Sequence, residues 1–198
     1  IRIMTIVKNE LFESEVDKCL KILKNGGVIL YPADTIWGIG CDATNEKAVD
    51  RIFKIKIRPP EKSMIILIND VDMLFDYVDR VPPVAVDIVN SVRNPLSIIY
   101  PKAKNLPKNV VANDGSIAIR KVKNDFCQEL IRRFGKPIVS TSANITGNAT
   151  PTRFRDISKT IINSMDYVVN IALDTNPEIK ASTIARFNDD GEFEIIRD

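Results

Sequence analysis

The stretch Gly26–Leu67, GGVILYPADTIWGIGCDATNEKAVDRIFKIKIRPPEKSMIIL, carries the strongest structural signals in the chain. The apolar run 28–31 ends at a proline and opens into a polar turn, as a buried strand does at the edge of a sheet. A helix-period segment follows at 46–55, and a second apolar strand is predicted at 64–68. A strand, a helix and a second strand in this order predict that the two strands pair in parallel. Thr35 then lies at the carboxyl end of the first strand.

Four cations lie around a rigid Pro-Pro pair between the predicted helix and the second strand: Lys54, Lys56, Arg58 and Lys62. Cations at a helix C-terminus also favour the macrodipole, and they often lie in solvent. Here the prolines fix the backbone after Arg58 and the chain returns at once to a buried strand, so we expect the side chains to be held in place. Arginine offers a planar fork and lysine a point charge, and both bind phosphate or carboxylate. The cluster therefore predicts an anion site.

The rest of the chain continues the alternation of helices and strands. Asn124 and Gly135 mark the start and end of one helix, and 102–113 is predicted to be irregular. Further helices are predicted at 14–24 with Ser14 as N-cap, 69–74 capped by Asn69, 82–92 with Val84, Ile88, Val89 and Val92 on one face, and 157–165; further strands are predicted at 96–100, 116–120, 138–141 and 167–170, with a hairpin of 182–187 and 192–197. The fold class is α/β, a single open twisted mixed sheet flanked by helices. We expect one domain over residues 4–198.

Composition excludes several classes of protein. The 198 residues carry a net charge of +2, which argues against a protein that binds nucleic acid through a bulk basic field. The sequence contains no histidine, which removes the Ser-His-Asp triad, the Cys-His pair and every zinc site that needs histidine. The three cysteines lack metal-ligand spacing and are interpreted as reduced core thiols. No apolar run is long enough to span a bilayer and no signal segment opens the chain, so we expect a cytoplasmic protein without a membrane partner.

The segment Gly38–Ala43 matches the loose dinucleotide-binding pattern G-x-G-x-x-A. In a dinucleotide-binding fold the first glycine closes a tight turn directly after the strand, whereas Gly38 comes seven positions after Tyr31. The expected acidic residue is replaced by the cationic cluster, so we interpret the match as coincidental. A Walker-type phosphate loop is absent, and any phosphate must be held by the basic cluster and by polar loops.

A second polar segment follows the predicted strand 138–141. Ser140, Thr141, Ser142 and Asn144 leave this strand as a group of hydroxyls and an amide, and the loop continues to Thr150. Loops of this length on a rigid scaffold often carry function. A helix cap or a solvated turn is the alternative on this segment alone.

Three separated motifs occur together in one order: Tyr31-Pro32-x-x-Thr35-x-x-Gly38-x-Gly40, then Lys56-x-Arg58-Pro59 with Lys62-Ser63-Met64, then Ser140-Thr141-Ser142-Ala143-Asn144 ending in Pro151-Thr152. Their order and spacing resemble the YrdC-like family of threonylcarbamoyl-adenylate synthases over about residues 16–197. The resemblance implies a cytoplasmic nucleotidyltransferase that makes threonylcarbamoyl-AMP and pyrophosphate from L-threonine, bicarbonate and ATP. It also implies Mg²⁺ brought with ATP, and a tRNA threonylcarbamoyltransferase that takes the product for modification of tRNA position 37. Weak contact with tRNA is a further expectation.

The resemblance also assigns residues by position. It implies that Lys56 and Arg58 act in catalysis, and it leaves the metal ligands unassigned. The residues implied for threonine binding are Thr35, Lys62, Ser63, Arg120 and Ser182; those implied for ATP binding are Lys54, Arg58, Ser116, Ser140, Ser142, Asn144 and Thr150. The chemistry needs no protein nucleophile, because the carbamate oxygen attacks the α-phosphate directly and cations spread over the phosphates.

The sequence departs from the family pattern at several positions. Asp34 stands where glutamate is common, Trp37 where tyrosine is common, and Ala181 replaces an acidic neighbour of Ser182. Two alternatives stay open. An RNA-binding module predicts salt-dependent RNA affinity without ATP turnover. A carbamoyl-transfer domain related to hydrogenase maturation predicts carbamoyl phosphate as substrate, usually in a multidomain chain.

Overall fold

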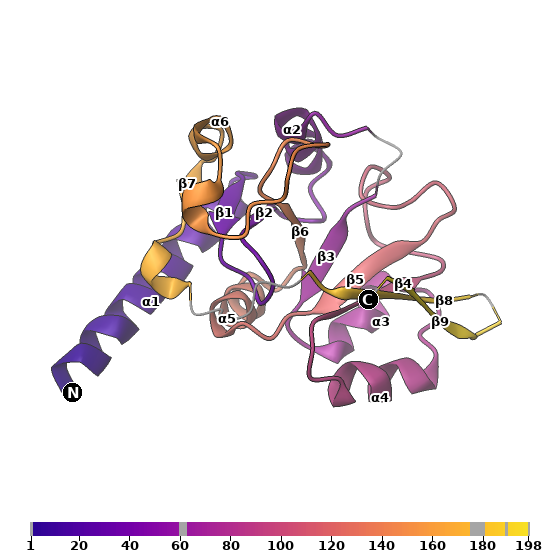
Figure 1. Ribbon diagram of the computed structural model, residues 1–198. Helices are drawn as coiled ribbons and strands as arrows, with labels where there is room; N and C mark the ends of the chain where they lie inside the picture. Colours follow the sequence, from indigo (N-terminus) through magenta and orange to yellow (C-terminus); the bar gives the residue numbers. More distant parts are fainter. Residues whose placement is uncertain (1, 60–62, 175–180, 189, 198) are drawn as a thin grey trace.

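The computed structural model describes residues 2–59, 63–174, 181–188 and 190–197, with side chains from Asn9 onward. These residues form a nine-stranded sheet in the order β7-β1-β2-β6-β3-β5-β4-β8-β9, with helices on both faces (Figure 1). Three neighbouring pairs, β1 with β7, β3 with β5 and β4 with β8, are parallel and the others are antiparallel. The predicted fold class, an open mixed sheet with flanking helices, is confirmed.

The bounds of most elements lie within two residues of the prediction. The strands are β1 Ile29–Tyr31, β2 Gly38–Gly40, β3 Ile65–Ile68, β4 Leu96–Tyr100, β5 Ile117–Lys121, β6 Ile138–Ser142, β7 Tyr167–Val168, β8 Thr183–Phe187 and β9 Phe193–Arg197. The α-helices are α1 Arg2–Lys24, α2 Glu46–Lys56, α3 Leu74–Tyr77, α4 Pro83–Ser91, α5 Asp125–Phe134 and α6 Lys159–Asn163; the 3₁₀ turns are η1 Val71–Met73, η2 Phe154–Asp156 and η3 Ile171–Leu173.

Alternate residues of the central strands pack into two separate cores. Tyr31 and Leu67 belong to the core that α1 and α5 cover, whereas Leu30 and Ile66 belong to the core that contains α2, α3 and α4. Side chains alternate between the two faces of a strand, so both faces of the sheet centre are buried. In Figure 1, α1 and α5 lie together toward the β7 and β1 end of the sheet, away from β4, β8 and β9.

Asparagine side chains cap the start of two helices, and Asn124 is the cap that the sequence predicted for α5. Asn45 accepts a hydrogen bond from the amide of Ala48 at 3.2 Å, and Asn124 accepts one from the amide of Cys127 at 3.0 Å. Gly135 ends α5 with φ 72°, a conformation that glycine adopts without steric cost. The interpretation of all three cysteines as buried free thiols is also confirmed.

Three predictions about helices are wrong in detail. Helix α1 begins at Arg2 rather than after Ser14, because residues 2–13 contain no glycine or proline and continue the same helix. The turn after β3 is capped by Asp70 instead of Asn69. In α4 the buried residue is Ala85, and Val84 is 48% exposed, so the face that packs on the sheet is rotated from the predicted one.

The predicted parallel pairing of the first two strands is also wrong. The chain turns back directly after β1 and forms β2, which pairs antiparallel with β1, and β6 then separates β2 from β3. Strands β1 and β3 therefore run in opposite directions and are not neighbours. A strand of three residues with two glycines gives no periodic signal, which is why β2 was not predicted.

The glycines of β2 serve packing. Gly40 lies against the ring of Tyr31, and a Cβ atom there would come within 2.5 Å of the carbonyl oxygen of Val139 and 2.7 Å of Tyr31 Cε1. Only glycine therefore lets β2 pass between β6 and the fully buried Tyr31. The interpretation of Gly38–Ala43 as a coincidental dinucleotide pattern agrees with this arrangement.

Among the described helices, none has the length and apolar character to cross a membrane.

Candidate active site

A cavity of 390 Å³ lies over the strands β6, β3, β5 and β4. Its floor is a row across four neighbouring strands, because Ser140 of β6 lies opposite Ile65 of β3, Ile65 opposite Ala118 of β5, and Ala118 opposite Ile99 of β4. Directly opposed residues share one face of a sheet. The register of the strands therefore determines the floor of the site.

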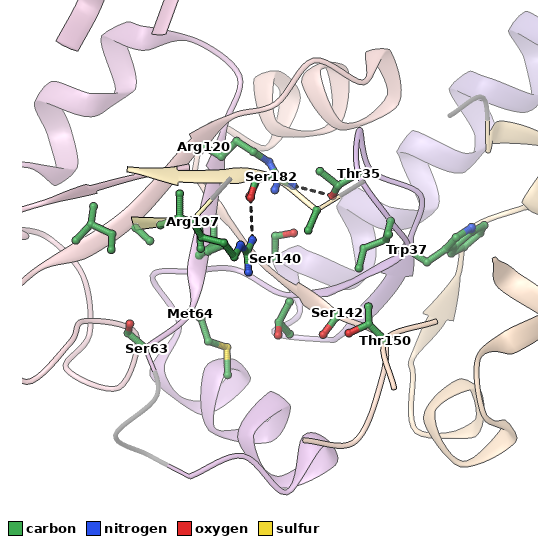
Figure 2. Close-up of a pocket in the computed structure, with 18 of the residues that line it drawn as sticks. Thr35, Trp37, Ser63, Met64, Arg120, Ser140, Ser142, Thr150, Ser182 and Arg197 are labelled. Atoms are coloured by element: carbon green, nitrogen blue, oxygen red, sulfur yellow. Dashed lines mark hydrogen bonds between the residues drawn. The ribbon is translucent and has the colours of Figure 1, made fainter. Parts of the chain in front are cut away.

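The walls come from segments far apart in the sequence. The loop after β1 supplies Thr35 and Trp37, the segment before β3 supplies Arg58 and Ser63, and the segment 181–184 supplies Ser182. Figure 2 shows Thr35, Arg120 and Ser182 together along one side of the pocket, with Ser142 and Thr150 on the opposite side. The pocket therefore has two polar regions joined by the floor of the sheet.

The charge of the lining is one-sided. Arg58, Arg120 and Arg197 line the pocket, and no carboxylate is among the described lining residues. Burial lowers the pKa of the Arg58 guanidinium, because a cation with less water around it is harder to keep charged. Three cations in one cavity indicate an anionic ligand.

A strained turn places Arg58 at the pocket wall. Helix α2 ends at Ile57, which has φ 48° and ψ 46°, the left-handed region that β-branched residues rarely adopt. The side chain of Ile57 is exposed, whereas Lys56 before it is buried and Arg58 after it lines the pocket. Nη2 of Arg58 donates to the carbonyl oxygen of Ser63 at 2.7 Å, which fixes the guanidinium against the start of β3.

Lys56 is buried and holds the polar loop after β6. Nζ donates to the carbonyl oxygen of Ser142 at 2.5 Å, to the carbonyl oxygen of Asn144 at 2.7 Å and to Asn144 Oδ1 at 3.3 Å. The amide of Thr146 donates to the carbonyl oxygen of Lys56 at 2.8 Å. Burial lowers the pKa of Lys56 to about 8, with a smaller effect from the charge of Arg58, so the amine is protonated at neutral pH. Its three donors fasten the loop after β6 to the end of α2.

The structure brings most of the sequence-predicted site residues into this one cavity. The residues that line it are Thr35, Arg58, Ser63, Arg120, Ser140, Ser142, Thr150 and Ser182. Lys56 and Asn144 support the cavity without lining it. Lys54 is exposed on the surface of α2, which contradicts the expectation that all four cations are held in place; the C-terminal end of a helix lets a side chain on its outer face reach solvent. Lys62 lies outside the described residues.

Ser116 lies at a neighbouring cavity of 190 Å³, which it lines with Lys102, Asp114 and Arg186. Its hydroxyl donates to Asp114 Oδ1 at 2.6 Å. Ile99 lines both cavities, so the two are adjacent along β4. Ser116 therefore lies beside the main pocket rather than in it.

Sequence reasoning missed Arg197. Nη2 of Arg197 donates to the carbonyl oxygen of Ser182 at 2.8 Å, and the residue lines the pocket from the end of β9. The alternation of side chains along β9 predicts that Arg197 lies on the same face of the strand as Phe193 and Ile195. It gives no sign that β9 pairs with β8 beside the pocket, because strand order is a long-range property of the sheet.

Comparisons with known proteins agree with this arrangement of residues. The family model named Sua5_yciO_yrdC and described as "Telomere recombination" matches residues 21–198. The chain belongs to the Sua5/YciO/YrdC family. Threonylcarbamoyl-AMP synthase of Pseudoalteromonas translucida is 34% identical over 169 residues, which cover 84% of this chain and 90% of that relative.

Solved structures of the Sua5/YciO/YrdC family share the fold. A variant of P. abyssi Sua5 gives a TM-score of 0.84 at 23% identity, over 92% of this chain and 55% of that one. P. abyssi Sua5 complexed with L-threonine gives a TM-score of 0.78 at 24% identity, over 86% of this chain and 50% of that one. The chain thus spans about half the length of P. abyssi Sua5, and at these identities the likeness shows the fold alone.

Proposed function

We propose that this protein is an L-threonylcarbamoyladenylate synthase, which forms threonylcarbamoyl-AMP and pyrophosphate from L-threonine, bicarbonate and ATP. The observation that carries the proposal is the cationic cavity, which gathers eight side chains of the family pattern from five separate segments. The membership of the Sua5/YciO/YrdC family and the synthase relative that matches over most of its length support it. The product serves tRNA modification, through a downstream threonylcarbamoyltransferase.

The two polar regions of the cavity suit the two halves of the reaction. Thr35, Arg120 and Ser182 offer a guanidinium and two hydroxyls, which suit the carboxylate and hydroxyl of threonine. Ser142 and Thr150 on the opposite side, with Arg58 at the wall, suit the ribose and phosphates of ATP.

The chemistry is a displacement at phosphorus. The threonine amine first forms a C–N bond to the carbon of bicarbonate and water leaves, which gives the carbamate. A carbamate oxygen then attacks the α-phosphorus while the bond to pyrophosphate breaks. Catalysis of this kind depends on positioning and on cations that stabilise charge on the phosphates. A protein nucleophile is unnecessary, which agrees with a sequence that contains no histidine.

Mg²⁺ enters this proposal with ATP. The described lining residues offer hydroxyls and arginines but no carboxylate, and the described part of the chain has no cluster of three acidic, cysteine or histidine side chains. Mg²⁺ commonly keeps several waters and binds through substrate phosphates. The residues present therefore fit a metal held mainly by the phosphates of ATP.

The decisive assay is incubation with L-threonine, bicarbonate, Mg²⁺ and ATP. We expect release of pyrophosphate that depends on threonine and bicarbonate, together with the mixed anhydride in the product mixture. Salt-dependent RNA binding without pyrophosphate release would favour the RNA-binding alternative. Turnover only with carbamoyl phosphate would favour the carbamoyl-transfer alternative.

Thr35→Ala should raise the KM for L-threonine about tenfold and change the KM for ATP little. The hydroxyl lies 3.4 Å from Nη2 of Arg120, on the side of the pocket assigned to threonine. Separate saturation curves for the two substrates measure both constants. An effect confined to ATP would place Thr35 in the nucleotide region instead.

Ser182→Ala should weaken threonine binding several-fold, and it should also lower the free energy of unfolding by about 1 kcal/mol. The stability cost arises because Ser182 Oγ lies 2.9 Å from Oγ of Ser97, which is fully buried and would lose its partner. Calorimetric titration and urea unfolding measure the two effects. The matched control is Ser97→Ala, which breaks the same hydrogen bond away from the pocket; equal loss of threonine affinity in both variants would leave Ser182 a structural role only.

A further inference from the structure

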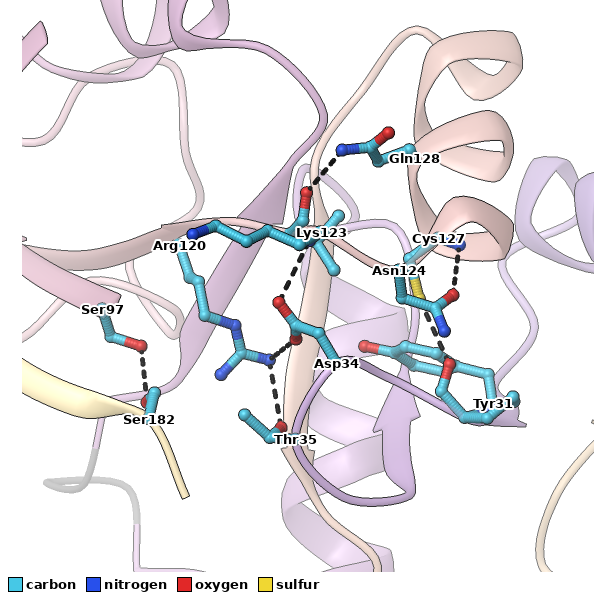
Figure 3. A network of polar contacts seen from close by, with 12 residues as sticks. Tyr31, Asp34, Thr35, Ser97, Arg120, Lys123, Asn124, Cys127, Gln128 and Ser182 are labelled. Atoms are coloured by element: carbon cyan, nitrogen blue, oxygen red, sulfur yellow. Dashed lines mark hydrogen bonds and ion pairs between the residues drawn. The ribbon is translucent and has the colours of Figure 1, made fainter. Parts of the chain in front are cut away.

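A buried carboxylate stands directly behind the pocket arginine Arg120. Asp34 Oδ1 lies 3.2 Å from Nη2 of Arg120, and the side chains are 7% and 4% exposed respectively. Asp34 Oδ2 accepts a hydrogen bond from the backbone amide of Lys123 at 3.0 Å. Figure 3 shows Asp34 between Arg120 on one side and the chain segment that leads into α5 on the other.

Among the residues that the structure describes, the polar contacts of the Arg120 side chain are made by one nitrogen. Nη2 is the atom that meets both Asp34 and Thr35, at 3.2 Å and 3.4 Å. The buried Nε has no hydrogen-bond partner among the described residues. A guanidinium that is anchored through one nitrogen and lines an open cavity can offer its other donors to a ligand carboxylate.

We propose that Asp34 is the positioning residue for Arg120, and that its negative charge sets the orientation in which the guanidinium receives the carboxylate of L-threonine. The inference rests on the proposed function for the identity of the ligand. Because little water reaches the pair, its charges interact through a low local dielectric, and solvent cannot replace a missing partner. Asp34 itself does not line the cavity, so it acts through Arg120.

The two contacts of Asp34 need different properties of the side chain. The amide of Lys123 needs only an oxygen acceptor, which asparagine also supplies, and the ammonium of Lys123 contacts the carbonyl oxygen of Val92 instead. The guanidinium needs a negative charge at a fixed distance. Asp34→Asn therefore keeps the contact that holds the segment before α5 and removes the charge that positions Arg120.

The test measures binding of L-threonine and of ATP by calorimetry in three variants of Asp34. We expect Asp34→Asn to weaken threonine binding about tenfold or more, since misplacing a binding group by about 1 Å has effects of this size, and to change ATP affinity less than twofold. Asp34→Glu, which restores the charge, should recover much of the threonine affinity, and Asp34→Ala should behave at least as badly as Asp34→Asn. The matched control is Asp125→Asn, which removes an exposed carboxylate in the first turn of α5.

Threonine affinity of Asp34→Asn within twofold of wild type would overturn the proposal, as would equal losses for threonine and ATP. If Asp34→Asn does not fold, Asp34→Glu decides: it should lower threonine affinity by less than the tenfold expected of Asp34→Asn and leave ATP affinity unchanged, and equal losses for the two ligands would overturn the proposal. Failure of the wild-type protein to bind threonine would contradict the proposed function. A measurement without ligand distinguishes that failure from failure of the positioning role of Asp34.

That measurement follows the Nε–H resonance of Arg120 in the free protein, assigned by its loss in Arg120→Lys. A held, buried guanidinium gives a slowly exchanging signal. We expect Asp34→Asn to shift it and to speed its exchange with solvent at least tenfold, while Asp125→Asn leaves it unchanged. An unaltered resonance in Asp34→Asn would overturn the positioning role whatever the ligand of the pocket.

Discussion

Arg58→Lys is expected to lower the turnover of ATP about 10²-fold while leaving the fold intact, which is the size of effect that follows loss of one charge-stabilising contact. Arg58 is fixed at the pocket wall by its 2.7 Å hydrogen bond to the carbonyl oxygen of Ser63. Lysine keeps the positive charge but cannot form two parallel hydrogen bonds to a phosphate.

The rate of pyrophosphate release at saturating threonine and ATP measures this effect, and circular dichroism verifies the fold. Lys47→Met provides the matched control, because Lys47 is an exposed cation on α2, the helix that precedes Arg58, and does not line the pocket. Near wild-type turnover in Arg58→Lys would show that Arg58 does not clamp a phosphate.

The elements that the sequence predicted well are those that local chemistry specifies. Asn45 and Asn124 cap helices because an amide oxygen accepts a hydrogen bond from the first turn, and Gly135 ends α5 because it adopts positive φ. Strand β4 was predicted at its observed bounds. Such signals lie within a few residues of each other and need no knowledge of the sheet.

The order of strands could not be predicted in this way. Strand β8 pairs with β4, and β6 inserts between β2 and β3, although their partners lie far away in the sequence. Ser182 reaches the pocket because β8 pairs with β4. Pairings of this kind depend on the packing of whole faces, which a local pattern does not contain.

Prediction of the site also succeeded where the signal is local and failed where it depends on the fold. Residue types and spacing found Thr35, Arg58 and the loop after β6, because polar groups at strand ends are visible in the sequence. They did not separate a side chain that lines the pocket from one that supports it. Lys54 and Lys56 are two residues apart on α2, yet one is exposed and the other is buried, since successive residues of a helix point in different directions.

Lys56→Met should act on both stability and nucleotide binding. Methionine fills a similar space but cannot donate, so the carbonyl oxygen of Asn144 would lose its donor. The carbonyl oxygen of Ser142 and Oδ1 of Asn144 would each lose one of two hydrogen bonds, because the amide of Asn144 and the hydroxyl of Ser142 still donate to them. We expect the free energy of unfolding to fall by about 2 to 3 kcal/mol, because a buried acceptor that loses its donor keeps its desolvation penalty.

The same change should weaken ATP binding by about tenfold to 10²-fold and leave L-threonine affinity within about twofold, because the freed loop carries Ser142 and Thr150 whereas Thr35, Arg120 and Ser182 lie on the opposite side of the pocket. Urea unfolding and calorimetric titration of each ligand measure these effects. The catalytic role that the family resemblance implies for Lys56 makes a different prediction: turnover would be lost while stability and ATP affinity stayed near those of the wild type. Because Nζ already serves three acceptors of the loop, we expect the first result, in which Lys56 contributes to the reaction by holding the residues that bind the nucleotide.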